Sequence, residues 1–502
     1  MERVKISSSG GCDLISTMPD PILHHILGLL KTREAVQTCV LSKRWQYLWI
    51  SLPSLDFDFR EFTALEEPPC DSEEEETSVP RAPSDTESER ARDSVRFAIF
   101  VEMVLFSCEP LHLDVFRLSF GALNSADVLL KDWVIYAVQH NPRVVHLAFL
   151  QLPPSLVHSI YTCTSLEELY LHHSERALSQ YTCRAAVNLP NLKRLSIHNV
   201  FLAKNELQDL LAGCPVLQYL WLERCQLQED ENSHQNNINA LKSKWLINSW
   251  LDRVEKSRPL TALESTLRTI IREHVNKLVQ MQEKIGHDSL QHLNIVNGNI
   301  PFIRAPNLLT FCYISSEPIV TLSMPSLTDA LLELKNPLIG GWLGLTSFLS
   351  GLVNVRTLEL QVPWAELQEE DARHVLPELP IFQQDVLPEL PIFQKMHELS
   401  VGAFCMCFDF CLVSWILGKV PNLKKLTLLQ QRECSCFGHD EEVANTSAWT
   451  DASLRTAVSH CNNLEVVEVK YSRFDQMVRE LVDALVDGTK ELQNANILLS
   501  KH

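Results

Sequence analysis

Five cysteines and one histidine form the two clusters in this sequence that could bind a metal. They are Cys405, Cys407 and Cys411, and then Cys434, Cys436 and His439 in "CSCFGH". Structural zinc sites usually space their cysteine pairs by two to four residues, whereas one residue separates each pair here. We therefore interpret these cysteines as reduced thiols in core and loop. The alternative is a metal-dependent hydrolase that uses the cluster.

No other pattern predicts catalysis or a cofactor. The stretch "GGWLG" at residues 340–344 lacks the Lys-Ser/Thr pair of a phosphate-binding loop, and there is no serine nucleophile elbow. The histidine pairs at 24–25 and 172–173 have no acidic or cysteine partner at a ligand spacing, so we expect surface histidines. The sequence thus predicts a protein that is not an enzyme and has no cofactor or metal.

Charge and hydropathy exclude further classes of partner. The formal net charge is −19 over 502 residues. Binding to a phosphate backbone requires a basic field, so nucleic acid is not an expected partner. No run of about 18 apolar residues occurs, and we expect no membrane span. The first residues lack the apolar core of a signal peptide. We therefore expect a nuclear and/or cytoplasmic protein with reduced cysteines.

Residues 14–49 predict three short helices. The expected helix starts are Asp20 with Pro21, then Thr32, then Ser42. Half of these residues are apolar or aromatic. A unit of this size is marginal by itself and cannot enclose them all. Part of its surface should therefore contact another protein.

The stretch "DLISTMPDPILHHILGLLKTREAVQTCVLSKRWQYLWISLPSLDFD" resembles a plant F-box, through "MPD", "VLSKRW" and "SLPSLDFD". We place this F-box at residues 13–58. Met18 and Pro21 depart mildly from the family pattern. In this family the F-box docks on a Skp-type adaptor of a cullin-RING ubiquitin ligase. By position, the adaptor-binding residues that the resemblance implies are Met18, Pro19, Ile22, Leu23, Ile26, Leu27, Val40, Leu41, Lys43, Trp45 and Trp49. About half of them could instead form the interior.

An acidic segment follows the F-box. Residues 66–90 hold ten acidic and two basic side chains, four prolines and almost nothing apolar. Such a composition cannot bury enough surface to offset chain entropy. We expect residues 59–95 to be a disordered linker.

Twelve units of the form apolar-x-x-apolar-x-apolar come next. Most steps between them lie near the 20–29 residues typical of leucine-rich repeats. The end of each unit suits a short strand with one buried face, and such strands stack into a solenoid. The predicted fold class is α/β, with a three-helix F-box followed by a degenerate leucine-rich-repeat solenoid over residues 96–395. The units are Leu113/Phe116/Leu118, Val144/Leu147/Phe149, Leu166/Leu169/Leu171, Leu192/Leu195/Ile197, Leu217/Leu220/Leu222, Leu290/Leu293/Ile295, Leu308/Phe311/Tyr313, Leu327/Ala330/Leu332, Val355/Leu358/Leu360, Met396/Leu399/Val401, Leu423/Leu426/Leu428 and Leu464/Val467/Val469.

Two segments interrupt the array, and its end differs. Residues 229–287 predict a two-helix insertion whose amphipathic stripe either packs on the solenoid or binds a partner. The segment "VLPELPIFQ" at 375–383 recurs at 386–394, which indicates a duplication in a tolerant loop. The stretch from "CNNLEVVEVKYSRF" to "ELQNANI" resembles the FBD end of plant F-box proteins. We assign residues 396–502 to terminal repeats and an FBD-like region.

Strand residues that alternate with the buried ones lie on the opposite face of the sheet, where a target could bind. The candidates are Tyr170, Arg194, Tyr219, Trp221 and His292, because exposed aromatic residues are frequent hot spots. The inserted helices could instead cover them. The sequence predicts the substrate-recognition subunit of an SCF-type ubiquitin ligase, with an unknown target protein. The alternative is an interaction scaffold with a vestigial F-box.

Overall fold

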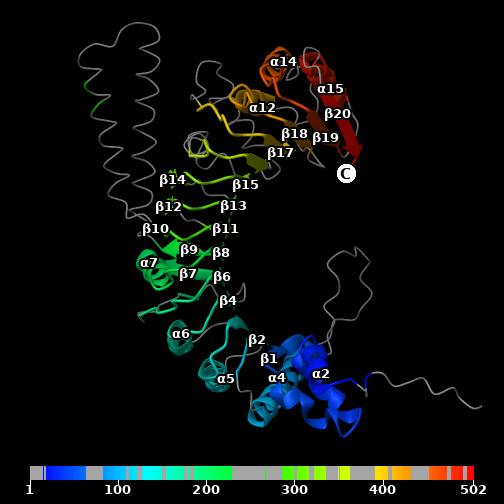
Figure 1. Cartoon of the computed structure of the whole chain (residues 1–502), viewed down its shortest axis with the longest axis vertical. Coiled ribbons are helices and arrows are strands. Elements are labelled where there is room, and N and C mark those ends of the chain that lie inside the picture. The colour runs from blue at the N-terminus through cyan, green and yellow to red at the C-terminus, as the bar shows by residue number, and fades with distance from the viewer. Residues whose placement is uncertain are drawn as a thin grey trace, which may run out of the picture. The chain divides into compact units, whose positions relative to one another are not determined.

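The computed structural model describes most of the predicted elements (Figure 1). The described residues form two compact units, one within residues 1–179 and 183–192, the other within 180–182 and 193–502. No described helix is long and apolar enough to cross a membrane. The described ranges are 18–63, 83–108, 112–120, 127–149, 154–173, 179–180, 186–228, 285–298, 302–315, 321–334, 351–361, 390–404, 410–430, 451–471, 476–489 and 495–501, with Ile15, Thr266, Thr269 and Leu349.

The described N-terminal part contains the three predicted helical segments, of which the first two start one residue earlier than expected and the third starts later. Asp20 and Thr32 are the first residues of their helices, which follow the extended residues Pro19 and Lys31. The third segment starts at Trp45 rather than after Ser42, and it is a 3₁₀-helix. The elements are α2 (Asp20–Leu27), α3 (Thr32–Gln37), η1 (Thr38–Val40) and η2 (Trp45–Ser51).

The first unit continues with a parallel sheet of the order β1-β2-β3-β4. Strand β1 lies inside the predicted F-box, and it is also the first strand of this sheet. Its Leu55 pairs with Phe116 and its Phe57 with Leu118 of β2. The strands are β1 (Ser54–Asp58), β2 (Val115–Phe120), β3 (Val144–Phe149) and β4 (Glu168–His173). The helical segments are η3 (Phe59–Phe62), α4 (Pro83–Ser107), α5 (Asp127–Gln139) and α6 (Pro154–Tyr161).

The prediction of a disordered linker over residues 59–95 is wrong at both ends. Segment η3 occupies its start, and α4 begins at Pro83, within the acidic segment. Phe59 contacts Phe97 of α4 and Phe120 of β2, with ring centroids 5.6 and 5.4 Å apart. This aromatic packing orders segments whose composition is polar, because contacts between distant parts of the chain override local composition. Residues 64–82 lie outside the described part of the chain.

The second unit repeats one parallel strand after another, and helices α12, α14 and α15 lie side by side on β17–β20 (Figure 1). Its main sheet has the order β6-β8-β11-β13-β15-β16-β17-β18-β19-β20. These strands are β6 (Arg194–His198), β8 (Tyr219–Glu223), β11 (His292–Val296), β13 (Thr310–Ser315), β15 (Asp329–Leu334), β16 (Thr357–Gln361), β17 (Glu398–Phe404), β18 (Lys425–Gln430), β19 (Val466–Tyr471) and β20 (Asn496–Lys501). Beside them run β7 (Val200–Ala203), β9 (Gln226–Gln228), β10 (Ile285–Gly286), β12 (Phe302–Arg304) and β14 (Thr321–Ser323), while β5 (Ser179–Gln180) spans the unit boundary. The helices are α7 (Lys204–Ala212), α12 (Phe410–Leu417), α14 (Asp451–Ser459) and α15 (Gln476–Thr489).

The predicted repeats correspond to the observed strands. The last two residues of every predicted unit lie on one of the twelve strands β2 to β4, β6, β8, β11, β13 and β15 to β19, and they are buried. One unit is misaligned: Val145 and Leu147 of β3, not Leu147 and Phe149, pair with Phe116 and Leu118. Because a strand alternates with period two, a shift by two residues leaves its apolar pattern unchanged.

The described cysteines are free thiols, as predicted. Five are buried, and burial raises the pKa of Cys108, Cys214 and Cys225 to about 12 and that of Cys461 to about 11. The fifth is Cys163. Thiols with such a pKa remain protonated at neutral pH and behave as apolar core residues. The predicted insertion at 229–287 lies outside the described residues except for Thr266, Thr269 and its last three residues, two of which form β10.

Candidate functional site

The N-terminal helices leave a set of large apolar side chains uncovered, here called the exposed apolar surface. Val40 is 82% exposed, Leu29 75%, Tyr47 65%, Leu41 64% and Ile22 47%. Fully burying one such side chain contributes about 1.5–3 kcal/mol, so this much uncovered apolar area indicates a contact with another protein. Leu29 and Tyr47 are not among the adaptor-binding residues that the sequence predicts. Leu29 could have been found from its place just beyond the helix end at Gly28.

Several residues predicted to bind an adaptor form the interior instead. Leu23 and Leu27 are 0% exposed and Trp45 is 6% exposed. They pack with Ala35, Leu48 and Leu52, and the half-buried Met18, Ile26 and Trp49 cover that core. The prediction that Leu23, Leu27 and Trp45 contact a partner is therefore corrected. A unit of three short helices needs its largest side chains to hold itself together.

The two basic residues before η2 have different surroundings. Arg44 donates from Nε to Asp20 Oδ1 at 3.0 Å and also contacts the carbonyl oxygen of Met18. It therefore ties the start of α2 to the start of η2. Lys43 is exposed, as is Pro19. Among the predicted adaptor-binding residues, Pro19, Ile22, Val40, Leu41 and Lys43 are thus exposed.

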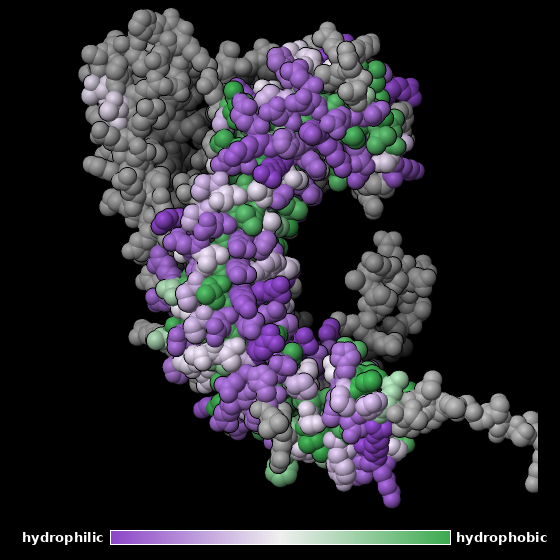
Figure 2. Space-filling view, in the orientation of Figure 1, coloured by the Kyte–Doolittle hydropathy of each residue, from purple (hydrophilic) through white to green (hydrophobic). Residues whose placement is uncertain are grey.

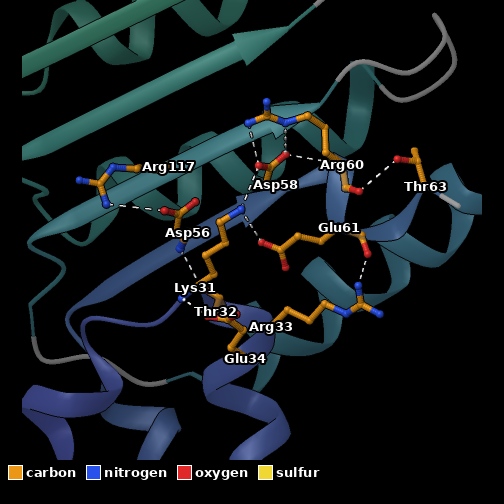
Figure 3. A network of polar contacts seen from close by, with 10 residues as sticks. All are labelled: Lys31, Thr32, Arg33, Glu34, Asp56, Asp58, Arg60, Glu61, Thr63 and Arg117. Atoms are coloured by element: carbon orange, nitrogen blue, oxygen red, sulfur yellow. Dashed lines mark hydrogen bonds and ion pairs between the residues drawn. The ribbon is translucent and has the colours of Figure 1, made fainter. Parts of the chain in front are cut away.

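A network of charged side chains joins the N-terminal helices to the sheet (Figure 3). Lys31 Nζ lies 3.1 Å from Asp58 Oδ2 and 3.0 Å from Glu61 Oε1. Arg60 donates from Nε to Asp58 Oδ1 at 3.1 Å and from Nη2 to Asp58 Oδ2 at 3.0 Å. The backbone N–H of Asp56 donates to Thr32 Oγ1 at 2.6 Å. These contacts fix α3 against β1 and η3.

The helix also reaches η3 through Arg33. Its guanidinium donates to the carbonyl oxygen of Glu61 and lies 4.5 Å from the centre of the Phe62 ring. Burial lowers the pKa of Lys31, but its bonds to Glu61 and Asp58 outweigh this and raise it above its ordinary value. The ammonium group is therefore charged throughout the neutral range.

Four of the five predicted target-binding residues come together on the polar sheet face of the second unit. Arg194, Tyr219 and His292 pair in one row across β6, β8 and β11, and Trp221 lies in the next row. The Tyr219 and His292 rings are 6.0 Å apart. Asn294 Nδ2 donates to the Tyr219 hydroxyl at 2.7 Å. The three aromatic rings are half-buried and Arg194 is exposed.

Tyr170 belongs to the first unit. It lies on β4, where its ring is 5.4 Å from His146 and 6.4 Å from His172. Burial, followed by the charge of Arg117, lowers the pKa of His146. Tyr170 and His146 are thus neighbours in one cross-strand row on the sheet of that unit, which continues to Arg117 and Asp56.

His198 lies in the row after that of Trp221, and its hydrogen bonds join these two rows. Its Nε2 lies 2.7 Å from Ser196 Oγ and its Nδ1 3.0 Å from Glu223 Oε2. A hydroxyl, an imidazole and a carboxylate in this order can activate a nucleophile. Ser196 lies on a regular strand rather than on a sharp turn, and His198 is only 6% exposed. We therefore assign the arrangement to the positioning of Trp221, whose ring is 5.8 Å from His198.

The charge of the sheet face changes along the second unit. Asp329 and Glu333 lie on β15, Glu359 on β16 and Glu398 on β17. Burial, then the charges of Glu333 and Glu359, raise the pKa of Cys312. The face therefore passes from aromatic side chains to carboxylates. The space-filling view shows mainly hydrophilic residues over the described part of this unit around β17–β20 (Figure 2).

No group of three or more potential metal ligands occurs among the described residues. The predicted cysteine cluster falls outside them: Cys405, Cys407, Cys434, Cys436 and His439 are not described, nor is the side chain of Cys411.

Comparisons with known proteins agree with the prediction of an F-box and of leucine-rich repeats. Residues 15–57 match the family model of the F-box domain. Residues 130–323 match the model "FBD-associated F-box protein At5g56370, LRR repeats". Neither model describes a catalytic domain.

Several curated proteins of Arabidopsis thaliana are similar to this chain. "Putative FBD-associated F-box protein At5g22720" is 30% identical over 230 residues, which cover 44% of this chain and 41% of that protein. "Putative F-box/FBD/LRR-repeat protein At4g00315" is 30% identical over 42% of this chain and 43% of that protein. "Putative F-box protein At1g58310" is 33% identical over 42% and 41%, respectively. The chain thus spans less than half the length of these relatives. It contains an F-box followed by leucine-rich repeats of the kind found in the plant F-box/FBD/LRR-repeat proteins.

Proposed function

We propose that this protein is the substrate-recognition subunit of an SCF-type ubiquitin ligase. The F-box would dock on a Skp-type adaptor, and the polar sheet face would capture a target protein. The observation that carries this proposal is the exposed apolar surface of the F-box, with Val40 82% and Leu41 64% exposed. The large apolar side chains of this surface need a protein partner for their burial, because so small a unit cannot cover them itself.

The proposed role needs no chemistry from the chain itself. A receptor held beside a ubiquitin-charged enzyme raises the local concentration of target lysines near that enzyme. The network around Lys31 supports this role, because it fixes the F-box on the strand that begins the repeats.

The polar face of the second unit supports target capture. Tyr219 and Trp221 offer large rigid side chains beside the exposed guanidinium of Arg194, and aromatic residues and arginine are enriched in binding hot spots. The carboxylates on β15–β17 favour a target with basic residues at the corresponding end.

Cells that express tagged variants test the proposal. The pair Val40→Asp/Leu41→Asp should leave target capture intact but prevent ubiquitination, so captured targets should accumulate on this variant relative to wild type. Trp221→Ala should lose captured targets while still binding the adaptor. Capture and turnover that are both unchanged by the F-box variant would favour the alternative, a scaffold with a vestigial F-box.

A further inference from the structure

Helix α4 presents apolar residues on two opposite faces. Phe97, Val101 and Val104 are buried against the first unit, at 2% exposure or less. Four further apolar residues are exposed: Val95 (58%), Ile99 (55%), Met103 (64%) and Phe106 (92%). These four recur at steps of four, four and three residues, so they form one stripe. At about 100° per residue, the stripe points away from the buried face.

The neighbouring helix α5 has the pattern expected of a surface helix. Trp133, Val134 and Ala137 are buried, whereas Lys131 and Asp132 are exposed. Single exposed apolar residues are ordinary on a protein surface. Four on one stripe, opposite the buried side of the same helix, mark a contact with another protein.

The residues along the stripe are arranged symmetrically about Ile99. Val95 and Met103 lie four residues to either side of it, and Arg92 and Phe106 lie seven residues to either side. In an antiparallel pair of α4 helices with a twofold axis at Ile99, Val95 of one copy faces Met103 of the other. Arg92 likewise faces Phe106 of the other copy, and a guanidinium over an aromatic ring is an attractive cation–π contact. Arg92 is exposed on this helix, so its guanidinium can reach the ring of the other copy.

We propose that the protein forms a symmetric homodimer through the exposed stripe of α4. The pairing uses the same patch on both copies, which is the requirement of a closed twofold interface. It lies on a different helix from the exposed apolar surface of the F-box, so a dimer can still present two F-boxes. Two target-binding faces in one particle would bind a multivalent target more tightly than one face does.

Sedimentation velocity of the full chain over a concentration series tests the proposal. The wild type should change from monomer to dimer as its concentration rises. Ile99→Glu places two carboxylates together at the twofold axis and should raise the dimer dissociation constant roughly 100-fold or more. Lys131→Glu on α5 introduces the same residue on the neighbouring helix and should leave the constant unchanged. A wild type that stays monomeric, or a dimer that Ile99→Glu does not weaken, overturns the proposal.

Cross-linking tests the orientation and does not depend on the strength of the dimer. Chains with Val95→Cys, mixed with chains with Met103→Cys, should give a cross-linked species that neither chain gives by itself and that exceeds the background of the native cysteines. Cross-linking of Val95→Cys chains to each other would show a parallel pair and exclude the proposed register. Circular dichroism of each variant confirms that its fold is retained, and adaptor binding should be the same for all of them.

Discussion

Lys31 Nζ contacts Asp58 Oδ2 at 3.1 Å, which joins the helical part of the F-box to the first strand of the sheet. Asp58 is 7% exposed and is also held by Arg60. The ion pair of Lys31 with Glu61, at 3.0 Å, crosses the boundary after residue 58 that the sequence predicts for the F-box. The F-box and the first repeat share one hydrogen-bonded network and one sheet (Figure 3).

Lys31→Met should destabilise the first unit. The substitution keeps the aliphatic stem but leaves the carboxylates of Asp58 and Glu61 with one positive charge fewer. We expect a loss of about 1–3 kcal/mol of unfolding free energy, because Asp58 is buried and needs its partners. Arg60→Met, which removes a side chain that is 84% exposed, should cost less. Urea unfolding of both variants measures the difference, and equal losses would contradict the role of Lys31.

The loss of unfolding free energy at acid pH should depend on Asp58. Burial would raise the pKa of this carboxyl, but hydrogen bonds from Arg60 and Lys31 outweigh it and hold the pKa below its ordinary value. Such a group stabilises the fold above its unfolded pKa of about 3.9, and this contribution is lost as the pH falls through its folded pKa. Asp58→Asn should therefore lower stability at pH 7 but flatten its decline below about pH 4. An unchanged decline in urea titrations would contradict this.

Substitutions of buried and of exposed apolar residues in the F-box should have different effects on its stability. Leu27→Ala removes a fully buried side chain and should cost about 2–5 kcal/mol of unfolding free energy. Val40→Ala removes a side chain that is 82% exposed and should change stability by less than about 0.5 kcal/mol. Thermal unfolding compares them directly. A large loss of stability for Val40→Ala would show that this residue belongs to the interior.

Arg224→Asn should stabilise the second unit. Arg224, Asn199 and Asn297 each follow a strand with a positive φ of 50–58°. Each donates its backbone N–H to the last carbonyl group, or the last but one, of the next strand in the sheet. Asparagine adopts this left-handed conformation more readily than arginine, so we expect a gain of about 0.5–1 kcal/mol. Arg224→Val should instead destabilise, and unfolding midpoints of the two variants give the order.

The sequence was sufficient to predict the repeat architecture because each strand buries one face. The period-two spacing of Leu195 and Ile197, or of Leu426 and Leu428, identifies them as residues of a buried strand face. Strand β20 was missed, because its Leu498 and Leu499 are 53% and 46% exposed and break the alternation. Helix α4 was missed, because its first residues are acidic and its anchors, such as Phe97, lie further along.

The candidate site was less predictable than the fold. A spacing of three and four residues identifies an apolar helix face but does not show whether that face is inside or outside a small unit. Leu23 and Ile22 are adjacent in the sequence, yet one is buried and the other is 47% exposed. The row formed by Arg194, Tyr219 and His292 was predictable, since it follows directly from the alternation along parallel strands.

Calorimetric titration of a Skp-type adaptor into the full chain tests the central claim most directly. Val40→Asp is compared with Val216→Asp, the same substitution at a residue of the second unit that is 40% exposed. We predict tight binding to wild type, a dissociation constant at least roughly 100-fold higher for Val40→Asp, and no change for Val216→Asp. Absence of binding to wild type, or equal affinity for all three chains, would contradict adaptor docking through the exposed apolar surface.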